Sequence, residues 1–145
     1  FGHMPISGAI IASHSLPILK CGCGRFGCYE TYGSGPGMER LAKHLLGRDL
    51  TSREIAFSRA KPEISRVWEI WCEINAALIL TIVTTVDPRT IVLGGGLSQI
   101  SGIIEDLESA LVRSAWRELT LPSIRLGARG ETAAALGAAY AAYNV

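Results

Sequence analysis

The sequence predicts an α/β fold, and three observations support this prediction. The second half of the 145-residue chain alternates between helical and strand patterns, in the order helix, strand, helix, strand, helix. Apolar residues make up 48% of the chain and charged residues 19%, which is enough apolar material for a packed core. No internal repeat and no low-complexity linker interrupts the chain.

The first part of the chain is expected to be largely irregular. Residues 1–20 contain Pro5, Gly8 and Pro17 and predict the end of a strand followed by a loop. Residues 21–37 are rich in glycine and hold three of the four cysteines, so they predict a tightly folded loop with one helical turn over residues 29–32.

Two short helices are predicted next. Residues 38–46 have apolar side chains at helical spacing, and Gly47 is a stop signal. Thr51 and Glu54 have the spacing of a capping box, in which each side chain bonds to the backbone amide of the other residue. The helix that begins there is expected to end near residue 60.

The clearest helical pattern covers residues 63–86, with Pro62 at a favourable first position. Apolar residues recur every three or four positions, at Ile64, Val67, Trp68, Trp71, Ile74, Leu78 and Ile82. The second half is apolar almost all round, so we expect it to be buried on all sides. Its most apolar stretch, residues 76–86, is too short to span a bilayer.

The remaining elements complete the alternation. Residues 90–93 are β-branched and predict a buried strand, which ends in three glycines, Gly94, Gly95 and Gly96. An amphipathic helix is expected over residues 102–119, a second strand over residues 123–126, and an alanine-rich helix over residues 132–143. The inward positions of the amphipathic helix are Ile103, Leu107, Leu111 and Ala115.

Charge and composition exclude several classes of function. The net charge is +1 and no run of like charges occurs, which argues against a nucleic-acid surface or a polybasic membrane anchor. The first five residues have neither the basic region nor the apolar core of a signal peptide. The expected location is therefore the cytoplasm, with no nucleic acid or membrane as partner.

Cys21, Cys23 and Cys28 form a C-x-C-x4-C pattern that predicts a zinc site. Zinc prefers four nitrogen or sulfur ligands in a tetrahedron, so a fourth ligand is required. The candidates are His3, His14, His44 and Cys72, and spacing alone does not choose among the histidines. Cys72 lies in the predicted core helix, where a small buried residue is the simpler interpretation.

The segment from Gly2-His3 through C-G-C-G-R-F-G-C-Y-E to L-G-G-G-L-S resembles the ROK family, which contains sugar kinases and repressors. The family signature pairs a Gly-His with C-x-C-G-x-x-G-C-x-E, and this sequence matches its fixed positions up to Glu30. The resemblance implies the C-terminal portion of an actin-like, hexokinase-like (ribonuclease H-like) ATPase fold with a zinc-stapled loop.

The resemblance also implies roles for individual residues. It selects His3 as the fourth zinc ligand, beside Cys21, Cys23 and Cys28. His3 and Glu30 would bind sugar hydroxyls, and Gly94, Gly95 and Gly96 would form one wall of the nucleotide site. The short Phe1-Gly2-His3 entry and the long following loop are similar to those of bacterial N-acetylglucosamine kinases.

Two features of the family's kinases are missing from this sequence. One is the Asp-x-Gly-x-Thr phosphate loop, and the other is the catalytic aspartate before the Gly-His segment. The three aspartates present, Asp49, Asp87 and Asp106, are expected in turns or on a helix surface. We therefore expect no catalytic residue in this chain and no kinase activity from it alone.

The expected organisation is a sugar-side, zinc-containing domain over residues 1–131. The helix over residues 132–145 is expected to pack on a nucleotide domain that this sequence lacks. In the intact protein the expected reaction is ATP- and magnesium-dependent phosphorylation of an N-acetylhexosamine, and N-acetylglucosamine is the favoured substrate. A homodimer, or association with the missing N-terminal portion, is also expected.

Other functions remain open at this point: the sugar-sensing part of a ROK repressor, a fructokinase- or glucokinase-type kinase, or a zinc-stapled scaffold.

Overall fold

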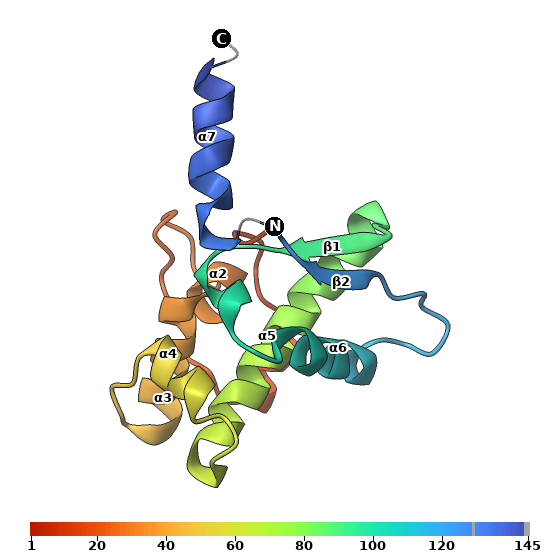
Figure 1. The fold of residues 1–145 in the computed structure, drawn as a ribbon. Coiled ribbons are helices and arrows are strands. Elements are labelled where there is room, and N and C mark those ends of the chain that lie inside the picture. The colour runs from red at the N-terminus through yellow and green to blue at the C-terminus, as the bar shows by residue number, and fades with distance from the viewer. Residues whose placement is uncertain (129, 144–145) are drawn as a thin grey trace.

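The computed structural model describes residues 1–128 and 130–143, and it has the predicted α/β architecture. Figure 1 shows the arrangement of its helices, strands and two short 3-10 helices, η1 and η2. The order is α1 (Gly8–Ser13), α2 (Tyr29–Gly33), α3 (Gly35–Leu46), α4 (Ser52–Phe57), α5 (Pro62–Val86), β1 (Thr90–Leu93), η1 (Gly96–Gln99), α6 (Ile103–Ser114), β2 (Ser123–Leu126), η2 (Gly130–Thr132) and α7 (Ala133–Tyr143).

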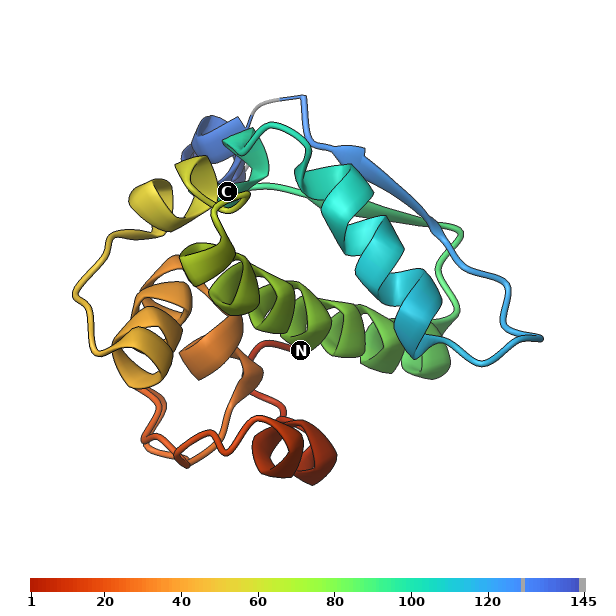
Figure 2. The ribbon, with the colours of Figure 1, turned by 90° about the horizontal axis from the view of Figure 1, so that it is seen from below.

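Helix α5 is the centre of the core, as its apolar periodicity predicts. Figure 2 shows it running through the middle of the molecule, and it packs against α2, α3, α4 and α6. The predicted inward residues from Ile64 to Ile74 are buried. Leu78 and Ile82 are only half-buried, however, because Ile79 and Val83 face the core instead. The expectation that the second half is buried on all sides is therefore wrong.

By length and composition alone, α5 also qualifies as a membrane span. It has 25 residues and its most apolar window has a mean hydropathy of 1.5. Ten of its residues are nevertheless buried against neighbouring elements, including Trp68 and Trp71, whose rings stack at 5.1 Å. These contacts are those of a core helix.

The two predicted strands pair in parallel. β1 and β2 align Thr90 with Ser123 and Leu93 with Leu126. Parallel strands need a crossover connection, and α6 supplies it while packing on both α5 and β2. The expectation of a buried strand is wrong for β1, because Val92 is 63% exposed and only alternate residues of the strand are half-buried.

Several element bounds differ from the prediction. Helix α1 was expected as loop, and it forms because the Ser7 hydroxyl accepts a bond from the Ala9 amide while Ile10 is buried. Helix α3 begins at Gly35, before the predicted position, because Ser34 caps it in the same way. The predicted capping box at the start of α4 is present.

The C-terminal ends of two helices also differ. Helix α4 ends at Phe57 and α6 ends at Ser114, both earlier than expected. Ala115 has an extended conformation and caps α6, so it is not one of the helix's inward positions.

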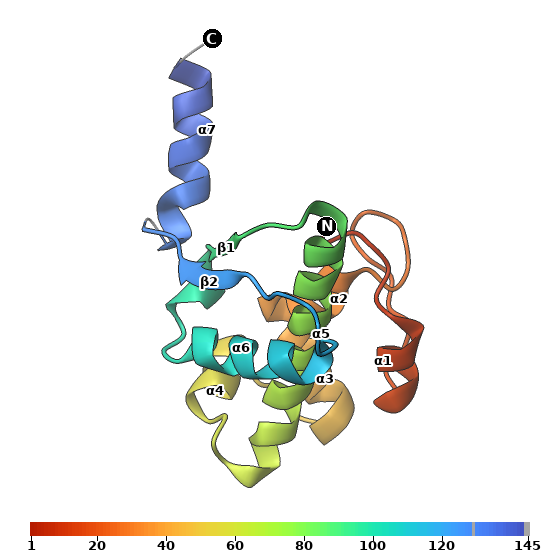
Figure 3. The same cartoon turned by 90° about the vertical axis from the view of Figure 1, so that its right-hand side faces the viewer.

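Helix α7 projects from the body of the molecule in two perpendicular views (Figures 1 and 3), and its main contact is with η2. Its apolar residues Leu136, Tyr140 and Tyr143 are exposed. The predicted final helix is thus present over most of its length, and the end of the expected 132–145 segment lies outside the described residues.

Candidate functional site

The cysteine loop is joined to the start of the chain by main-chain hydrogen bonds. The Ile6 amide donates to the Gly27 carbonyl at 2.7 Å, the Tyr29 amide to Met4 at 3.0 Å, and the Glu30 amide to Gly2 at 2.8 Å. These bonds lay residues 2–6 against residues 27–30. The backbone of His3 is therefore placed beside Cys28 although 25 residues separate them in sequence.

Two glycines and one tyrosine give the loop its shape. Gly24 and Gly27 have φ values of 89° and 67°, which other residues rarely adopt, whereas Gly22 has no such requirement. The buried Tyr32 hydroxyl donates to the Pro17 carbonyl at 2.8 Å and accepts from the Leu19 amide at 3.1 Å. The loop segment around residues 17–19, which leads into Cys21, is thereby fixed to α2.

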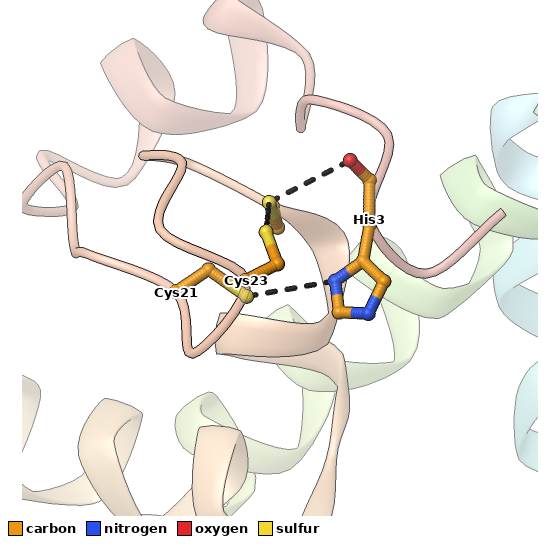
Figure 4. A group of neighbouring side chains, drawn as sticks. His3, Cys21 and Cys23 are labelled. Carbon is orange, nitrogen blue, oxygen red and sulfur yellow. Dashed lines mark hydrogen bonds between the residues drawn. The ribbon is translucent and has the colours of Figure 1, made fainter.

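The folded loop brings His3, Cys21, Cys23 and Cys28 together, and Figure 4 shows the cluster. One ligand atom from each residue lies within 4.8 Å of the other three. The Cys21 sulfur is 3.6 Å from His3 Nδ1, and the Cys23 and Cys28 sulfurs are 3.7 Å apart. Tetrahedral zinc with ordinary bond lengths has S···S edges of about 3.8 Å and S···N edges of about 3.6 Å. The donor set and its spacing therefore fit zinc.

Two thiols of the cluster have pKa values that are shifted in opposite directions. A hydrogen bond from the Cys23 backbone is the main reason that the pKa of Cys21 falls to about 6, and the contact with His3 adds to it. Burial is the main reason that the pKa of Cys28 rises to about 11, with Cys23 and Cys21 contributing. Cys21 is thus already a thiolate near neutral pH, which is the form that binds metal.

The other candidate ligands are engaged elsewhere. His14 Nε2 lies 2.9 Å from the Glu73 carboxylate, and its Nδ1 accepts from Arg66 at 3.0 Å, so this ring joins α1 to α5. His44 Nε2 contacts the Ser15 carbonyl at 3.0 Å. Cys72 is 2% exposed within the core, and burial raises the pKa of its thiol to about 12.

Glu30 lies on the same edge of the loop as His3. It is in the first turn of α2, where a carboxylate is favoured, and it is exposed. A Cβ atom added at Gly2 would lie 3.1 Å from Glu30 Oε2, so the carboxylate covers the residue that precedes His3. In Figure 4 His3 Nδ1 faces the sulfurs while the second ring nitrogen faces away from them. An imidazole nitrogen and a carboxylate are therefore both available at this edge.

A second candidate site is a cavity of about 600 Å³ that residues of α3, α4 and η1 line. Of the three predicted glycines, Gly96 lines it, and Gly94 and Gly95 lie in the exposed turn just before. Gly95 has a φ of 79°, and a Cβ atom at any of the three glycines would meet only open space.

Sequence reasoning missed the other walls of this cavity. Gly35 and Pro36 contribute from the start of α3, and Arg53 and Phe57 from α4; the Phe57 side chain is 91% exposed. The signal that was overlooked is the Ser34-Gly35-Pro36-Gly37 run, in which a capping serine and glycines mark a helix start open to a ligand.

Nearly the whole chain matches a known protein family. The model of the ROK family matches residues 1–144. N-acetylgalactosamine kinase AgaK of Shewanella sp. (strain ANA-3) is 35% identical over 143 residues, which are 96% of this chain and 46% of that protein. N-acetyl-D-glucosamine kinase of Histophilus somni (strain 129Pt) is 37% identical over 125 residues, which are 85% of this chain and 41% of that protein.

Solved structures share the fold. ROK hexokinase from Thermus thermophilus has a TM-score of 0.71 at 30% identity, covering 98% of this chain and 46% of that one. A ROK glucokinase from Streptomyces griseus, solved with glucose and AMPPNP, has a TM-score of 0.78 at 22% identity, covering 100% and 51%. This chain therefore spans about half the length of the relatives it matches. The match to the family model over almost every residue shows that the chain belongs to the ROK family.

Proposed function

We propose that this chain forms the sugar side, and one wall of the nucleotide site, of an ATP-dependent kinase for an N-acetylhexosamine, with N-acetylglucosamine as first candidate. The observation that carries the proposal is that His3 and Glu30 lie at one edge of the cysteine loop, where His3 and the three cysteines bring four possible metal ligands together. The curated relatives support it, since those between 31% and 37% identical are named as kinases of N-acetylated hexosamines.

Zinc is proposed as a structural cofactor held by His3, Cys21, Cys23 and Cys28. These residues supply four ligands, which fills a tetrahedral shell and leaves no position for a reacting water. When bound, zinc supplies a fixed crosslink between the start of the chain and the cysteine loop.

The sugar would contact the outer nitrogen of His3 and the carboxylate of Glu30. With Nδ1 as the zinc ligand, the proton of the neutral imidazole would reside on Nε2, which would then donate to a sugar hydroxyl. Glu30 is acceptor-only when ionised and would receive hydroxyl protons. A donor and an acceptor side by side can bind the neighbouring hydroxyls of a pyranose.

The nucleotide is proposed to occupy the cavity between α3, α4 and η1, with Gly94, Gly95 and Gly96 along one wall. Leu97 and Phe57 give this cavity an apolar surface suited to a base. The proposed reaction transfers the γ-phosphoryl group of magnesium-bound ATP to a sugar hydroxyl. No residue of this chain is assigned as the catalytic base, so we expect the chain alone to be inactive.

The organisation of the intact protein is also a proposal. Helix α7 has exposed apolar side chains and little contact with the body, so we propose that it packs on the nucleotide domain of the complete protein. Reduced thiolate ligands suit the cytoplasm as the compartment. A homodimer remains a proposal that sedimentation analysis would test.

The test uses the complete protein and titration calorimetry with N-acetylglucosamine, N-acetylgalactosamine and glucose, together with a coupled assay of ADP formation. We expect phosphorylation of at least one N-acetylhexosamine in preference to glucose. Glu30→Gln should weaken sugar binding by about 10-fold or more, because a hydrogen bond to a charged group contributes about 1.5–3 kcal/mol. The matched control is Glu63→Gln, a change at an exposed position on the first turn of α5.

Two outcomes would overturn the proposal. Binding of the sugar without any ADP formation would favour the sugar-sensing role of a ROK repressor. Equal sugar affinity in the Glu30→Gln variant and the wild type would remove Glu30 from the site.

A further inference from the structure

Arg59 lies where the two walls of the cavity between α3, α4 and η1 meet. One wall comes from α3 and α4, and the other comes from residues 96–101. These walls are neighbours in space (Figure 2), although α5 and β1 separate them in the sequence. In the part of the chain that the structure describes, every hydrogen bond between residues 35–59 and residues 96–106 comes from the Arg59 side chain.

The guanidinium group of Arg59 bonds in three directions. Nη1 donates to the Ala56 carbonyl at 2.9 Å, in the last turn of α4, and Nη2 donates to the Ser101 carbonyl at 2.6 Å. Nε donates to Asp106 Oδ2 on α6 at 3.1 Å. One rigid, planar group therefore joins the end of the first wall to the end of the second.

The neighbours of Arg59 hold its guanidinium group in place. Trp68 is buried in α5, its Nε1 donates to Asp106 Oδ2 at 3.0 Å, and the centre of its ring is 5.2 Å from the guanidinium carbon. Gly102 leaves room for this approach, because a Cβ atom there would lie 2.9 Å from Arg59 Nη2. The contact between the walls is thus anchored to the core.

These contacts indicate what kind of role Arg59 has. Each of its guanidinium nitrogens already donates to a protein oxygen, and its charge is paired with Asp106. A guanidinium that is engaged in this way holds the two walls together and has no fully unpaired nitrogen for a phosphate group.

We propose that Arg59 is a positioning residue for the nucleotide, because it keeps residues 96–101 at a fixed distance from α4. This inference rests on the proposed nucleotide site and adds to that site a residue that acts through its walls. Its effect should be selective, since no residue that lines this cavity belongs to the cysteine cluster.

The test measures KM for ATP and KM for N-acetylglucosamine in the complete protein, comparing Arg59→Gln and Arg59→Lys with the wild type. Lysine keeps the charge, but its single nitrogen cannot replace a planar fork that bonds to three oxygens. We expect KM for ATP to rise about 10-fold or more in both variants, because hydrogen bonds from a charged group are lost. KM for the sugar should stay unchanged. Arg113→Gln is the matched control, because this exposed arginine of α6 does not line the cavity.

Chemical rescue separates positioning from general stability. A second cavity of about 780 Å³, lined by Arg59, Trp68 and Asp106 among others, gives a small cation access to the guanidinium position. Ethylguanidinium in solution should therefore restore the affinity of Arg59→Ala for ATP, whereas ethylammonium should not. If Arg59→Gln does not fold, as judged by urea unfolding, Arg59→Lys and the rescue experiment still decide the question.

Failure of this inference is distinguishable from failure of the proposed nucleotide site. In the wild type, a non-hydrolysable ATP analogue should protect residues 52–57 and 96–101 from hydrogen exchange. If it protects neither segment, the proposed nucleotide site is wrong and this inference falls with it. If it protects both, but the Arg59 variants keep the wild-type KM for ATP, only the role of Arg59 is overturned. A wild-type KM for ATP in Arg59→Lys alone would mean that Arg59 acts through its charge and not by positioning the walls.

Discussion

Cys21 and Cys28 belong to one small cluster, yet their thiols differ in proton affinity. With pKa values of about 6 and about 11, Cys21 is largely ionised at pH 7 while Cys28 keeps its proton. A metal that binds both sulfurs must displace the proton of Cys28.

We therefore predict that zinc binding at pH 7.5 releases at least one proton per ion. The apparent zinc affinity should rise with pH throughout the range below the pKa of Cys28, and should fall more steeply below pH 6, where Cys21 also takes up a proton. Calorimetric titrations in buffers of different ionisation enthalpy measure the number of protons. Zinc binding that is independent of buffer and pH would contradict the prediction.

Cys72 differs from the cluster in its accessibility. It is 2% exposed and its thiol pKa is raised to about 12, whereas Cys23 is exposed. We predict that N-ethylmaleimide modifies Cys23 in chelated, folded protein and leaves Cys72 unmodified until the protein is unfolded. Peptide mass spectrometry gives the order of modification, and early labelling of Cys72 would show that the α5–α6 core opens readily.

At the scale of the element, the contact between α2 and α3 depends on one glycine. A Cβ atom at Gly37 would lie 2.3 Å from the Tyr32 carbonyl oxygen, so the two helices approach too closely for any side chain there. We predict that Gly37→Ala destabilises the fold by about 1–3 kcal/mol, the usual cost of overpacking. Gly8→Ala is the control, since an added Cβ atom there meets nothing within 4 Å. Urea unfolding of both variants measures the difference.

The capping box of α4 gives a prediction with a pH dependence. Bonds from the Thr51 amide and hydroxyl lower the pKa of Glu54, so this carboxylate stabilises the folded state when it is ionised. Its contribution is complete above the unfolded-state pKa of about 4.3 and disappears as the pH falls through the lower folded-state value. Glu54→Gln should therefore destabilise the protein at pH 7 and have little effect at pH 3, as measured by urea unfolding. An equal loss at both pH values would contradict this account.

The elements that the sequence predicted best are those with strong local signals. Helix α5 follows from its apolar period, and α4 from Thr51 and Glu54. Helix α1 was missed because six residues hold too little periodicity to detect. The prediction for α6 ran past its end because Trp116 and Leu119 continue the apolar pattern beyond the last helical turn, although Trp116 is 52% exposed.

The candidate site was only partly predictable for a similar reason. Three cysteines close in sequence indicated the metal, and family resemblance was needed to choose His3, because its approach to Cys21 depends on main-chain pairing across 18 or more residues. The α3 and α4 walls of the second cavity come from distant parts of the chain, so no local pattern joins them to Gly96.

At the scale of the whole molecule, stability is expected to be uneven. Helix α5 is packed on several sides, whereas α7 has few contacts and exposed side chains at Leu136, Tyr140 and Tyr143. We predict that backbone amides of α7 exchange with solvent much faster than those of α5 in the 145-residue chain.

The same measurement tests the proposed role of α7 in the complete protein. Hydrogen exchange followed by mass spectrometry should show α7 protected there, because its apolar side chains are then covered. Equally fast exchange in both forms would mean that α7 does not pack on another part of the protein.

The bonds that join residues 2–6 to residues 27–30 have one more consequence. They use amides and carbonyls only, so they do not require particular side chains at the exposed positions 4 and 5. Met4 and Pro5, both exposed, can therefore be exchanged without displacing the imidazole next to them. The edge that we propose for the sugar thus tolerates change at positions 4 and 5, while the hydrogen bonds beneath it are kept.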